Sequence, residues 1–268
     1  MKRMEYIDIH SHLNDPRFDA DLSDVLVRMR EASVASIVVG TDRVMSERAI
    51  LLAEQHPDLW ATIGLHPTDN HKETFDDAVY IKMAAHPRVV AIGECGLDYH
   101  WPEHDNWPTG MTEEKNRQHE LFERQIAIAL RADKPLMIHG RPTRGSMDAY
   151  EDILTILKSH PGIRGNVHFF VGDIPVAKQF LDLGFTMSFT GVLTFTHDYD
   201  EVVRFIPSDS LMSETDAPYV APVPHRGKRN EPLFVGEIAT AIAHIRGEEA
   251  TKTQGALTRN AVQAFRLS

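Results

Sequence analysis

The sequence predicts a (β/α)8 barrel, and three observations support this fold. Eight short apolar runs rich in β-branched residues alternate with longer segments of helical periodicity. Strands that alternate with helices pair in parallel through right-handed crossovers, and eight such units close into a barrel. The first run leads into HSHLNDP, which lacks glycine, whereas a doubly wound open sheet usually has a glycine-rich phosphate loop there. The open sheet is therefore the alternative.

The elements follow from local pattern. The helical segments are the longer ones, and in the third of them Leu121, Ile128 and Ala132 recur at helical spacing. The clearest helices are predicted at 22–32, 45–55 and 120–132. The strands are predicted at 6–9, 35–40, 59–64, 88–93, 135–139, 165–170, 185–189 and 210–214.

The connection after the fourth predicted strand, residues 100–116, is long and contains Trp101, His104 and Trp107. Two interpretations stay open for it. It forms a lid over the active site, or it is a surface loop held by its own aromatic side chains.

Composition favours one globular domain over residues 1–268, with 42% hydrophobic and 25% charged residues. Cys95 is the sole cysteine, which excludes an internal disulfide and favours a reducing, cytoplasmic location. No apolar segment indicates a signal peptide or a membrane span, and no obligatory protein partner is evident. The net charge of −11 argues against a general polyanion binder. A nucleic-acid enzyme stays possible if basic residues cluster locally or a metal supplies positive charge.

Polar side chains stand at the carboxyl ends of six predicted strands, where the active sites of such barrels lie. In YIDIHSHL, residues i and i+2 of an extended backbone point to the same side, so His10 and His12 project together. Burying such groups unpaired is costly, whereas a divalent metal centre satisfies them together. The side chains at the strand ends are His10, His12, His66, Glu94, His139, Arg141, His168, Glu214 and Asp216.

The number of ligands favours two divalent ions, because four histidines and two carboxylates exceed the needs of one ion once water is counted. Two ions about 3.5–4 Å apart need a bridging group, which a carboxylate supplies and a neutral imidazole does not. Glu94 is the predicted bridge. The ligands suit Zn²⁺ or Mn²⁺, with Fe²⁺ also possible and Mg²⁺ at a carboxylate-rich position. The other ligands divide into His10, His12 and Asp216 for one ion and His139 and His168 for the other.

The motifs DIHSHL, GLHP, GECGLDY, IHGR, VHFF and ETDAPYVAPVPHRGKRNEP together resemble the TatD family of metal-dependent hydrolases, which belongs to the amidohydrolase-like barrels. The resemblance extends from Tyr6 to about Phe265, and the block 213–232 is its most specific part. The family's metal ligands match the six residues divided above, with Glu94 again as the bridge. Phe169 and Val171 depart from the family's usual cysteine and small polar residue, which changes the pocket shape and leaves the ligands in place.

The resemblance implies a divalent-metal-dependent deoxyribonuclease with DNA, as single strands or ends, as its substrate. A metal-activated water would attack the phosphodiester, with Glu94 and Asp216 as the catalytic carboxylates and Asp216 as the group that orients the water or takes its proton. The same metals could instead polarise a carbonyl oxygen, so a lactone, amide or aminoacyl-ester hydrolase is the alternative. A binding protein with a structural metal is a third possibility, but structural sites are closed and mostly tetrahedral.

Substrate contacts are predicted from position. The loop 224–232 after the eighth strand opens onto the active-site face, and its guanidinium groups suit phosphate. The competing interpretation is a loop solvated by its charges or paired with nearby acids. The predicted substrate-binding residues are His66, Arg141, Glu214, Arg226, Lys228 and Arg229.

Two further acids lie beside the predicted ligands. Asp8 either orients His10 or His12 through a hydrogen bond or is a satisfied buried acid. Asp98 in GLDY is predicted to hold its loop and receives no catalytic role.

Overall fold

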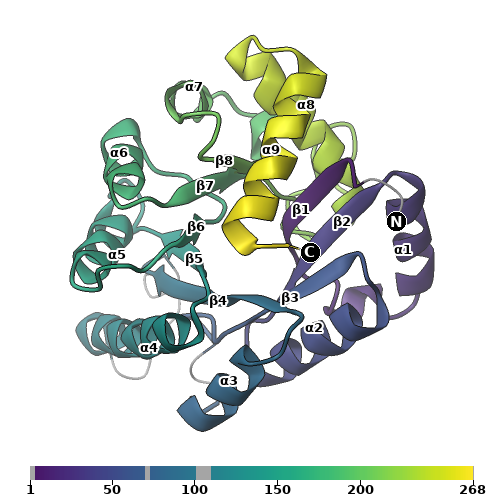
Figure 1. Ribbon diagram of the computed structural model, residues 1–268. Helices are drawn as coiled ribbons and strands as arrows, with labels where there is room; N and C mark the ends of the chain where they lie inside the picture. The colour runs from purple at the N-terminus through teal and green to yellow at the C-terminus, as the bar shows by residue number, and fades with distance from the viewer. Residues whose placement is uncertain (1–3, 70–72, 101–109, 268) are drawn as a thin grey trace.

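The computed structural model describes residues 4–69, 73–100 and 110–267. Its strands form one parallel sheet in the order β1 to β8, each strand pairing with the next along the chain. Figure 1 shows this sheet curling into a barrel with helices outside it, which confirms the predicted (β/α)8 fold. The strands are β1 Tyr6–Ser11, β2 Val34–Val39, β3 Leu59–Ile63, β4 Val89–Asp98, β5 Leu136–Arg141, β6 Gly165–Val167, β7 Thr186–Phe189 and β8 Leu211–Ser213.

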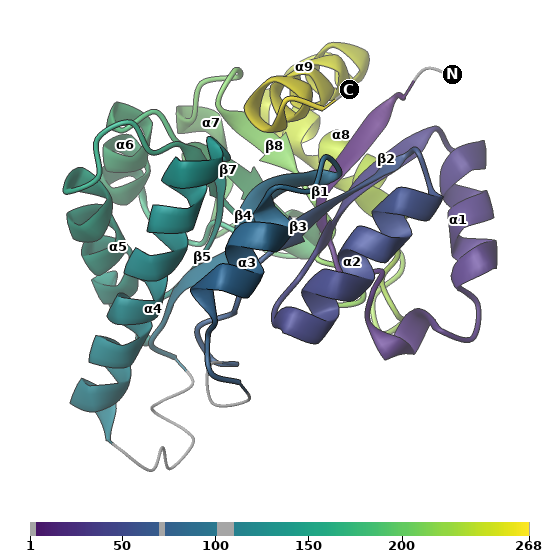
Figure 2. The same ribbon diagram turned by 60° about the horizontal axis from the view of Figure 1, so that its bottom comes forward.

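Helices surround the barrel, as Figure 2 shows for α2, α3 and α4. Several begin at an aspartate whose carboxylate accepts hydrogen bonds from the first free backbone N–H groups, such as Asp42 before α2 and Asp173 before α6. The α-helices are α1 Leu22–Glu31, α2 Arg43–Gln55, α3 Asp77–Ala84, α4 Met111–Ala132, α5 Asp148–Lys158, α6 Ile174–Asp182, α7 Asp200–Phe205, α8 Val235–Arg246 and α9 Ala250–Phe265. Short 3-10 helices are η1 Pro16–Phe18, η3 Gly191–Thr194 and η4 Pro232–Phe234.

The barrel closes between β1 and β8, at a seam formed by the chain that follows β8. Ser11 forms an isolated parallel bridge with Ala217, and the His12 N–H donates to the Ala217 carbonyl at 2.7 Å. Behind this bridge the fully buried Asp8 carboxylate accepts from the Thr215 N–H at 2.8 Å and from the Thr215 hydroxyl at 2.6 Å. Asp8 is therefore a satisfied buried acid that joins the first and last strands, the second of its two predicted roles.

Helix α9 covers the end of the barrel where the strands begin. The Thr258 hydroxyl donates to the Glu5 carbonyl at 2.8 Å, and the Asn260 amide donates to the Leu211 carbonyl at 2.8 Å. Phe265 of α9 joins a buried apolar cluster with residues near the starts of several strands. Figure 1 shows α9 crossing this end. The opposite end, where the strands finish, is left for the functional site.

Three elements differ from the sequence-based expectation by three residues or more, and one of them is β6, which ends at Val167 rather than at residue 170. β4 continues to Asp98 rather than ending at residue 93, and α4 begins at Met111 rather than at residue 120. The last part of the predicted 100–116 loop is therefore helical. Residues 101–109, with Trp101, His104 and Trp107, lie outside the described residues, so the lid stays a prediction.

Candidate metal centre

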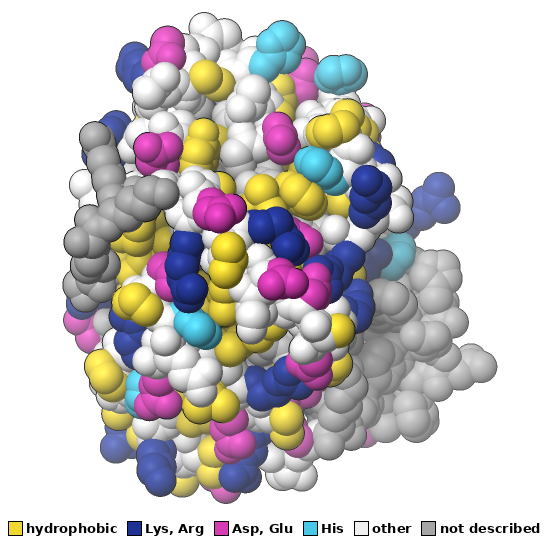
Figure 3. All heavy atoms as spheres, turned by 90° about the vertical axis from the view of Figure 1, so that its right-hand side faces the viewer, with side chains coloured by type: hydrophobic (Ala, Val, Ile, Leu, Met, Phe, Trp, Pro, Cys, Tyr) yellow, Lys and Arg dark blue, Asp and Glu magenta, His cyan; other side chains and the backbone are white. Residues whose placement is uncertain are grey.

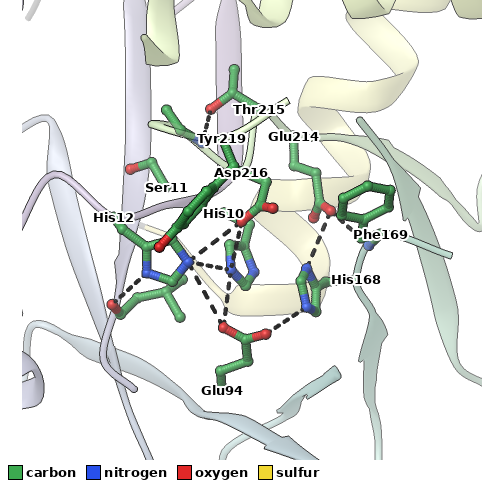
Figure 4. Close-up of polar contacts among 12 residues, drawn as sticks. His10, Ser11, His12, Glu94, His168, Phe169, Glu214, Thr215, Asp216 and Tyr219 are labelled. Carbon is green, nitrogen blue, oxygen red and sulfur yellow. Dashed lines mark hydrogen bonds and ion pairs between the residues drawn. The ribbon is translucent and has the colours of Figure 1, made fainter. Parts of the chain in front are cut away.

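The histidines and carboxylates predicted as ligands converge at the carboxyl ends of the strands, as the barrel fold requires. Most of these residues lie in the last part of a strand or within three residues after it, whereas Glu94 lies within β4, four residues before its end. Figure 4 shows the side chains of His10, His12, Glu94, His168 and Asp216 turning toward one another. They form two groups of ligand atoms that meet at one carboxylate. The strands and their side chains are β1 with His10 and His12, β3 with His66, β4 with Glu94, β5 with His139, β6 with His168 and β8 with Asp216.

The first group combines two imidazoles with two carboxylate oxygens. His10 Nε2 lies 3.2 Å from His12 Nε2, 3.4 Å from Glu94 Oε2 and 3.7 Å from Asp216 Oδ1. His12 Nε2 lies 3.8 Å from Glu94 Oε2 and 3.4 Å from Asp216 Oδ1. Ligands about 2.0–2.1 Å from a tetrahedral ion are about 3.3–3.5 Å apart. The donor atoms therefore have the spacing of a divalent metal site.

The second group faces the other oxygen of Glu94. Glu94 Oε1 lies 2.9 Å from His139 Nδ1, 2.8 Å from His168 Nε2 and 3.5 Å from His66 Nε2. His139 Nδ1 and His168 Nε2 are 3.4 Å apart. His66 was predicted to contact substrate, but its ring nitrogen is placed where it could also be a ligand of the second ion.

Burial and charge explain why Glu94 can serve both groups. Burial alone would raise the pKa of this carboxyl, but His168, His66 and His10 hold it well below its usual range. The opposite shift occurs at His168. Burial would lower the pKa of this imidazole, but Glu94 and Glu214 raise the pKa well above its ordinary value. The surroundings of Glu94 therefore favour its ionised form, the form in which a carboxylate binds divalent ions.

Asp98 orients His139, a role that the sequence-based interpretation missed. Its Oδ2 accepts from His139 Nε2 at 2.9 Å, which leaves Nδ1 free to face Glu94. Gln118 of α4 fixes Asp98 in turn, since its amide accepts from the Asp98 N–H at 2.8 Å and donates to the Asp98 carbonyl at 3.0 Å. Because β4 extends through residue 98, Asp98 lies four residues after Glu94 on one strand, and this even spacing is the signal in the sequence.

Glu214 lies behind the ligands instead of at the cavity surface. It is fully buried, accepts from the Phe169 N–H at 2.6 Å and from the Ser188 hydroxyl at 2.8 Å, and its Oε1 is 3.3 Å from His168 Nδ1. The sequence leaves three roles open for Glu214: a substrate contact, an acid behind the ligands and a member of a buried ion pair. Its burial and its contacts with His168 and Phe169 favour an acid that holds the ligand from behind over the substrate contact.

A cavity of about 770 Å³ opens above the two groups of ligands. Its lining includes His66 and Arg141, whose substrate contacts stay a prediction, together with Glu94 and Asp216, the two carboxylates predicted to be catalytic. Pockets of about 300–1,000 Å³ are typical of small-molecule sites. The cavity therefore has the size of a small-molecule site and is too small for a folded macromolecule.

The three cations predicted in the 224–232 loop differ in their surroundings, and none belongs to the cavity lining. Arg229 pairs with Asp21, its Nη2 lying 2.6 Å from Oδ2, and also reaches Glu231 at 3.2 Å. Arg229 thus follows the alternative interpretation, in which the loop pairs with nearby acids. Arg226 and Lys228 are exposed, and the Arg226 guanidinium lies over the Phe195 ring at 4.0 Å. Their phosphate contacts stay a prediction.

A parallel eight-stranded barrel with histidine and carboxylate clusters at its strand ends defines a metal-dependent hydrolase. Residues 7–266 match the family described as TatD related DNase, and the chain belongs to this family. The predicted resemblance is therefore confirmed. Among the described residues, no helix combines the length and the apolar character needed to cross a membrane.

Similar proteins support this assignment over nearly the whole chain. The uncharacterized metal-dependent hydrolase YabD of Bacillus subtilis is 40% identical over 267 residues, covering 97% of this chain and 99% of the relative. The 3'-5' ssDNA/RNA exonuclease TatD of Erwinia tasmaniensis is 32% identical over 272 residues, with 97% and 99% coverage. The crystal structure of YJJV, a TatD homolog from Escherichia coli K12, has a TM-score of 0.84 and 28% identity and covers 99% of both chains.

Proposed function

We propose that this protein is a two-metal nuclease that hydrolyses phosphodiester bonds of DNA at a single-stranded end. The observation that carries the proposal is Glu94, whose two oxygens face two separate groups of imidazoles. Two ions held on either side of it would lower the pKa of a water molecule and neutralise charge on the phosphoryl oxygens. The relative from Erwinia tasmaniensis, which bears the name of a 3'-5' ssDNA/RNA exonuclease, supports this class of substrate.

In this proposal, Asp216 and Arg141 have distinct roles. Asp216 lines the cavity with a partly exposed carboxylate, so it can orient the attacking water and accept its proton. Arg141 lines the cavity directly after the strand that carries His139, where a guanidinium can donate two hydrogen bonds to a phosphate. The cavity's size favours a chain end or an unstacked nucleotide over a base-paired duplex.

The net charge of −11 agrees with recognition of a strand end rather than of a long duplex. Figure 3 shows the side of the molecule over α1 and α2, where basic and acidic side chains are interspersed without a continuous basic band. Binding along a duplex relies on many phosphate contacts by lysine and arginine. A short contact at the cavity needs only local cations, of which Arg141, Arg226 and Lys228 are our proposals.

The test is hydrolysis of single-stranded DNA, of a phosphodiester reporter and of a panel of lactones after metal removal and reloading with Mn²⁺ or Zn²⁺. We expect DNA cleavage that depends on the metal, with Asp216→Asn lowering kcat at least about 100-fold, the usual range for loss of a general base. Faster turnover of a lactone than of any nucleotide would favour the carbonyl hydrolase and reject the nuclease.

Salt dependence tests the proposed phosphate contacts. Arg226→Ala and Lys228→Ala should raise KM for DNA at low salt, and each should reduce the salt slope of single-strand binding by about 0.7. Arg141→Ala should lower kcat itself, because it lies beside the reacting phosphate. Arg229→Ala is the matched control, since its guanidinium is paired with Asp21, and its salt slope should equal that of wild type. An unchanged slope in all of these variants would remove the loop from the DNA site.

A further inference from the structure

The cavity has walls of two different chemical kinds. Its floor is the group of ligands described above, but one wall is apolar and comes from the loops that follow β6, β7 and β8. Apolar side chains offer a phosphate neither a hydrogen-bond donor nor a positive charge. Recognition of the phosphate and the metal alone therefore does not explain this wall. The wall consists of Phe169, Val171, Val192, Tyr199 and Val220.

The wall is built into the fold. Val171, Val192 and Tyr199 pack against the main hydrophobic core, which fixes their positions. Phe169 and Val220 have positive φ angles of 45° and 47°, a region that bulky or β-branched residues rarely adopt and that often marks functional sites. The backbone N–H of Phe169 donates a hydrogen bond to the buried Glu214 carboxylate at 2.6 Å, which fixes this backbone.

Phe169 joins the wall to the metal centre. It directly follows His168, and the two rings lie edge to face with centroids 6.5 Å apart. Figure 4 shows the Phe169 ring beside the ligand cluster. A group that contacts this ring would therefore lie beside His168, one of the residues that would hold the second ion.

We propose that this wall is a subsite for the nucleobase of the nucleotide whose phosphodiester is cleaved. The proposal rests on the nuclease function above and names what that nuclease recognises. A nucleobase is the part of a nucleic acid with broad apolar faces, and stacking on aromatic side chains binds every base because each has a π-face. Apart from the Tyr199 hydroxyl, the wall offers no polar side-chain atom to read a base edge. The subsite therefore requires a base without selecting which one.

The wild-type protein provides the first test. Metal-loaded enzyme is given single strands with a normal terminal nucleotide, carrying each of the four bases in turn, or with a terminal abasic site. We expect kcat/KM to be about 5- to 100-fold lower for the abasic strand, the effect of losing one stacked base, and to differ little among the four bases. Equal cleavage of normal and abasic strands overturns the base subsite and leaves the nuclease function intact.

If no DNA is cleaved, a measurement of nucleotide binding tests the base subsite independently of the nuclease function. Calorimetry on the Mn²⁺-loaded protein compares dAMP with 2-deoxyribose 5-phosphate, which share the phosphate and differ in the base. Tighter binding of dAMP supports the subsite even when the nuclease function fails. Equal binding of the two ligands rejects the subsite.

Variants of the wall test whether the preference for a normal over an abasic strand depends on the wall. Phe169→Ala should bring the normal-to-abasic ratio close to one, while Phe205→Ala, which removes a 40% exposed phenylalanine outside the cavity lining, should leave the ratio unchanged. Metal content is measured in parallel because Phe169 adjoins a ligand. If Phe169→Ala does not fold or load metal, Val192→Ala removes wall surface from η3, away from the ligands. A ratio that stays at the wild-type value in a folded, loaded wall variant overturns the proposal.

Discussion

Glu94 is the residue on which the two groups of ligands depend. Its two oxygens face different imidazoles, and its pKa is held well below the ordinary range by His168, His66 and His10 against the effect of burial. Glu94→Gln keeps the shape but removes the charge, so we predict that it lowers the number of tightly bound divalent ions from two to one or none. Elemental analysis after reloading and desalting measures this number.

The control for Glu94 is Glu237→Gln, which changes the charge equally at an exposed position on α8. It should bind as much metal as wild type. Two ions retained by Glu94→Gln would show that Glu94 is not the bridge.

Asp98 gives a second prediction at the scale of one residue. It accepts the His139 Nε2–H at 2.9 Å and so sets which ring nitrogen faces the metal centre. Because loss of such an orienting group typically weakens metal affinity about 10- to 100-fold, we expect a loss of this size in Asp98→Asn. Competition with a coloured chelator measures it, and Asp182→Asn on the exposed end of α6 is the control. Unchanged affinity would mean that packing alone orients His139.

Single residues show where the sequence suffices and where it does not. The convergence of the predicted ligands could be foreseen because a barrel brings its strand ends to one place, while their binding of metal stays a prediction. The apolar run that predicts the fourth strand ends at residue 93, so the sequence places Asp98 in a loop, although its even spacing from Glu94 fits a continued strand. Arg229 could not be placed, because its partner Asp21 is distant in sequence and only the folded chain brings the two together.

At the scale of elements, α4 and α5 are tied together beside the site. Asp148 of α5 accepts from the Thr143 N–H at 2.9 Å, and Lys115 of α4 lies 3.0 Å from its other oxygen. Burial would raise the pKa of Asp148, but these donors hold it below the ordinary value. A carboxyl whose pKa is depressed by folding stabilises the fold above its unfolded pKa, about 3.9, and loses this effect as pH falls through the folded value.

We therefore predict that Asp148→Asn lowers the free energy of unfolding at pH 7 and that its difference from wild type shrinks toward pH 3. Urea unfolding of the metal-free protein at pH 7, 5 and 3 measures this difference without the contribution of the metal centre. Asp209→Asn, in the turn before β8, changes the same charge at an exposed position and should show no such trend. A difference that stays constant with pH would assign the effect to packing.

The boundaries of elements were the least predictable feature. All eight strands were found because apolar runs mark them, but α4 begins nine residues earlier than its apolar periodicity suggested. Its first turns are polar, with MTEEKN at their start, so hydrophobic spacing gives no signal there. The buried Glu114 and Gln118 belong to this stretch. Gln118 is the residue whose amide forms two hydrogen bonds with the backbone of Asp98.

At the scale of the whole molecule, the seam between β1 and β8 holds the barrel closed. Thr215→Val removes the hydroxyl that donates to the buried Asp8 at 2.6 Å while keeping the shape of the side chain. Because a buried acceptor is left without that donor, we predict a loss of about 1–3 kcal/mol in the free energy of unfolding. Chemical denaturation measures it.

The matched control for the seam is Thr240→Val, whose hydroxyl donates to a backbone carbonyl on the exposed face of α8. Its effect should stay within about 0.5 kcal/mol, as for most surface substitutions. Similar losses in both threonine variants would show that the seam contributes nothing special to stability.

The two sides of the seam, which both contribute to the metal centre, are synthesised at different times during translation. His10 and His12 are translated before Asp216, which follows only after about 200 further residues, and these take roughly 10–40 s at about 5–20 residues per second. Until then β1 lacks its partner at the seam, and the two histidines lack the carboxylate that completes their group. A chain that stops before residue 216 can neither close the barrel nor build this site. Metal bound by this group would therefore distinguish chains that extend beyond residue 217 from shorter, unfinished ones.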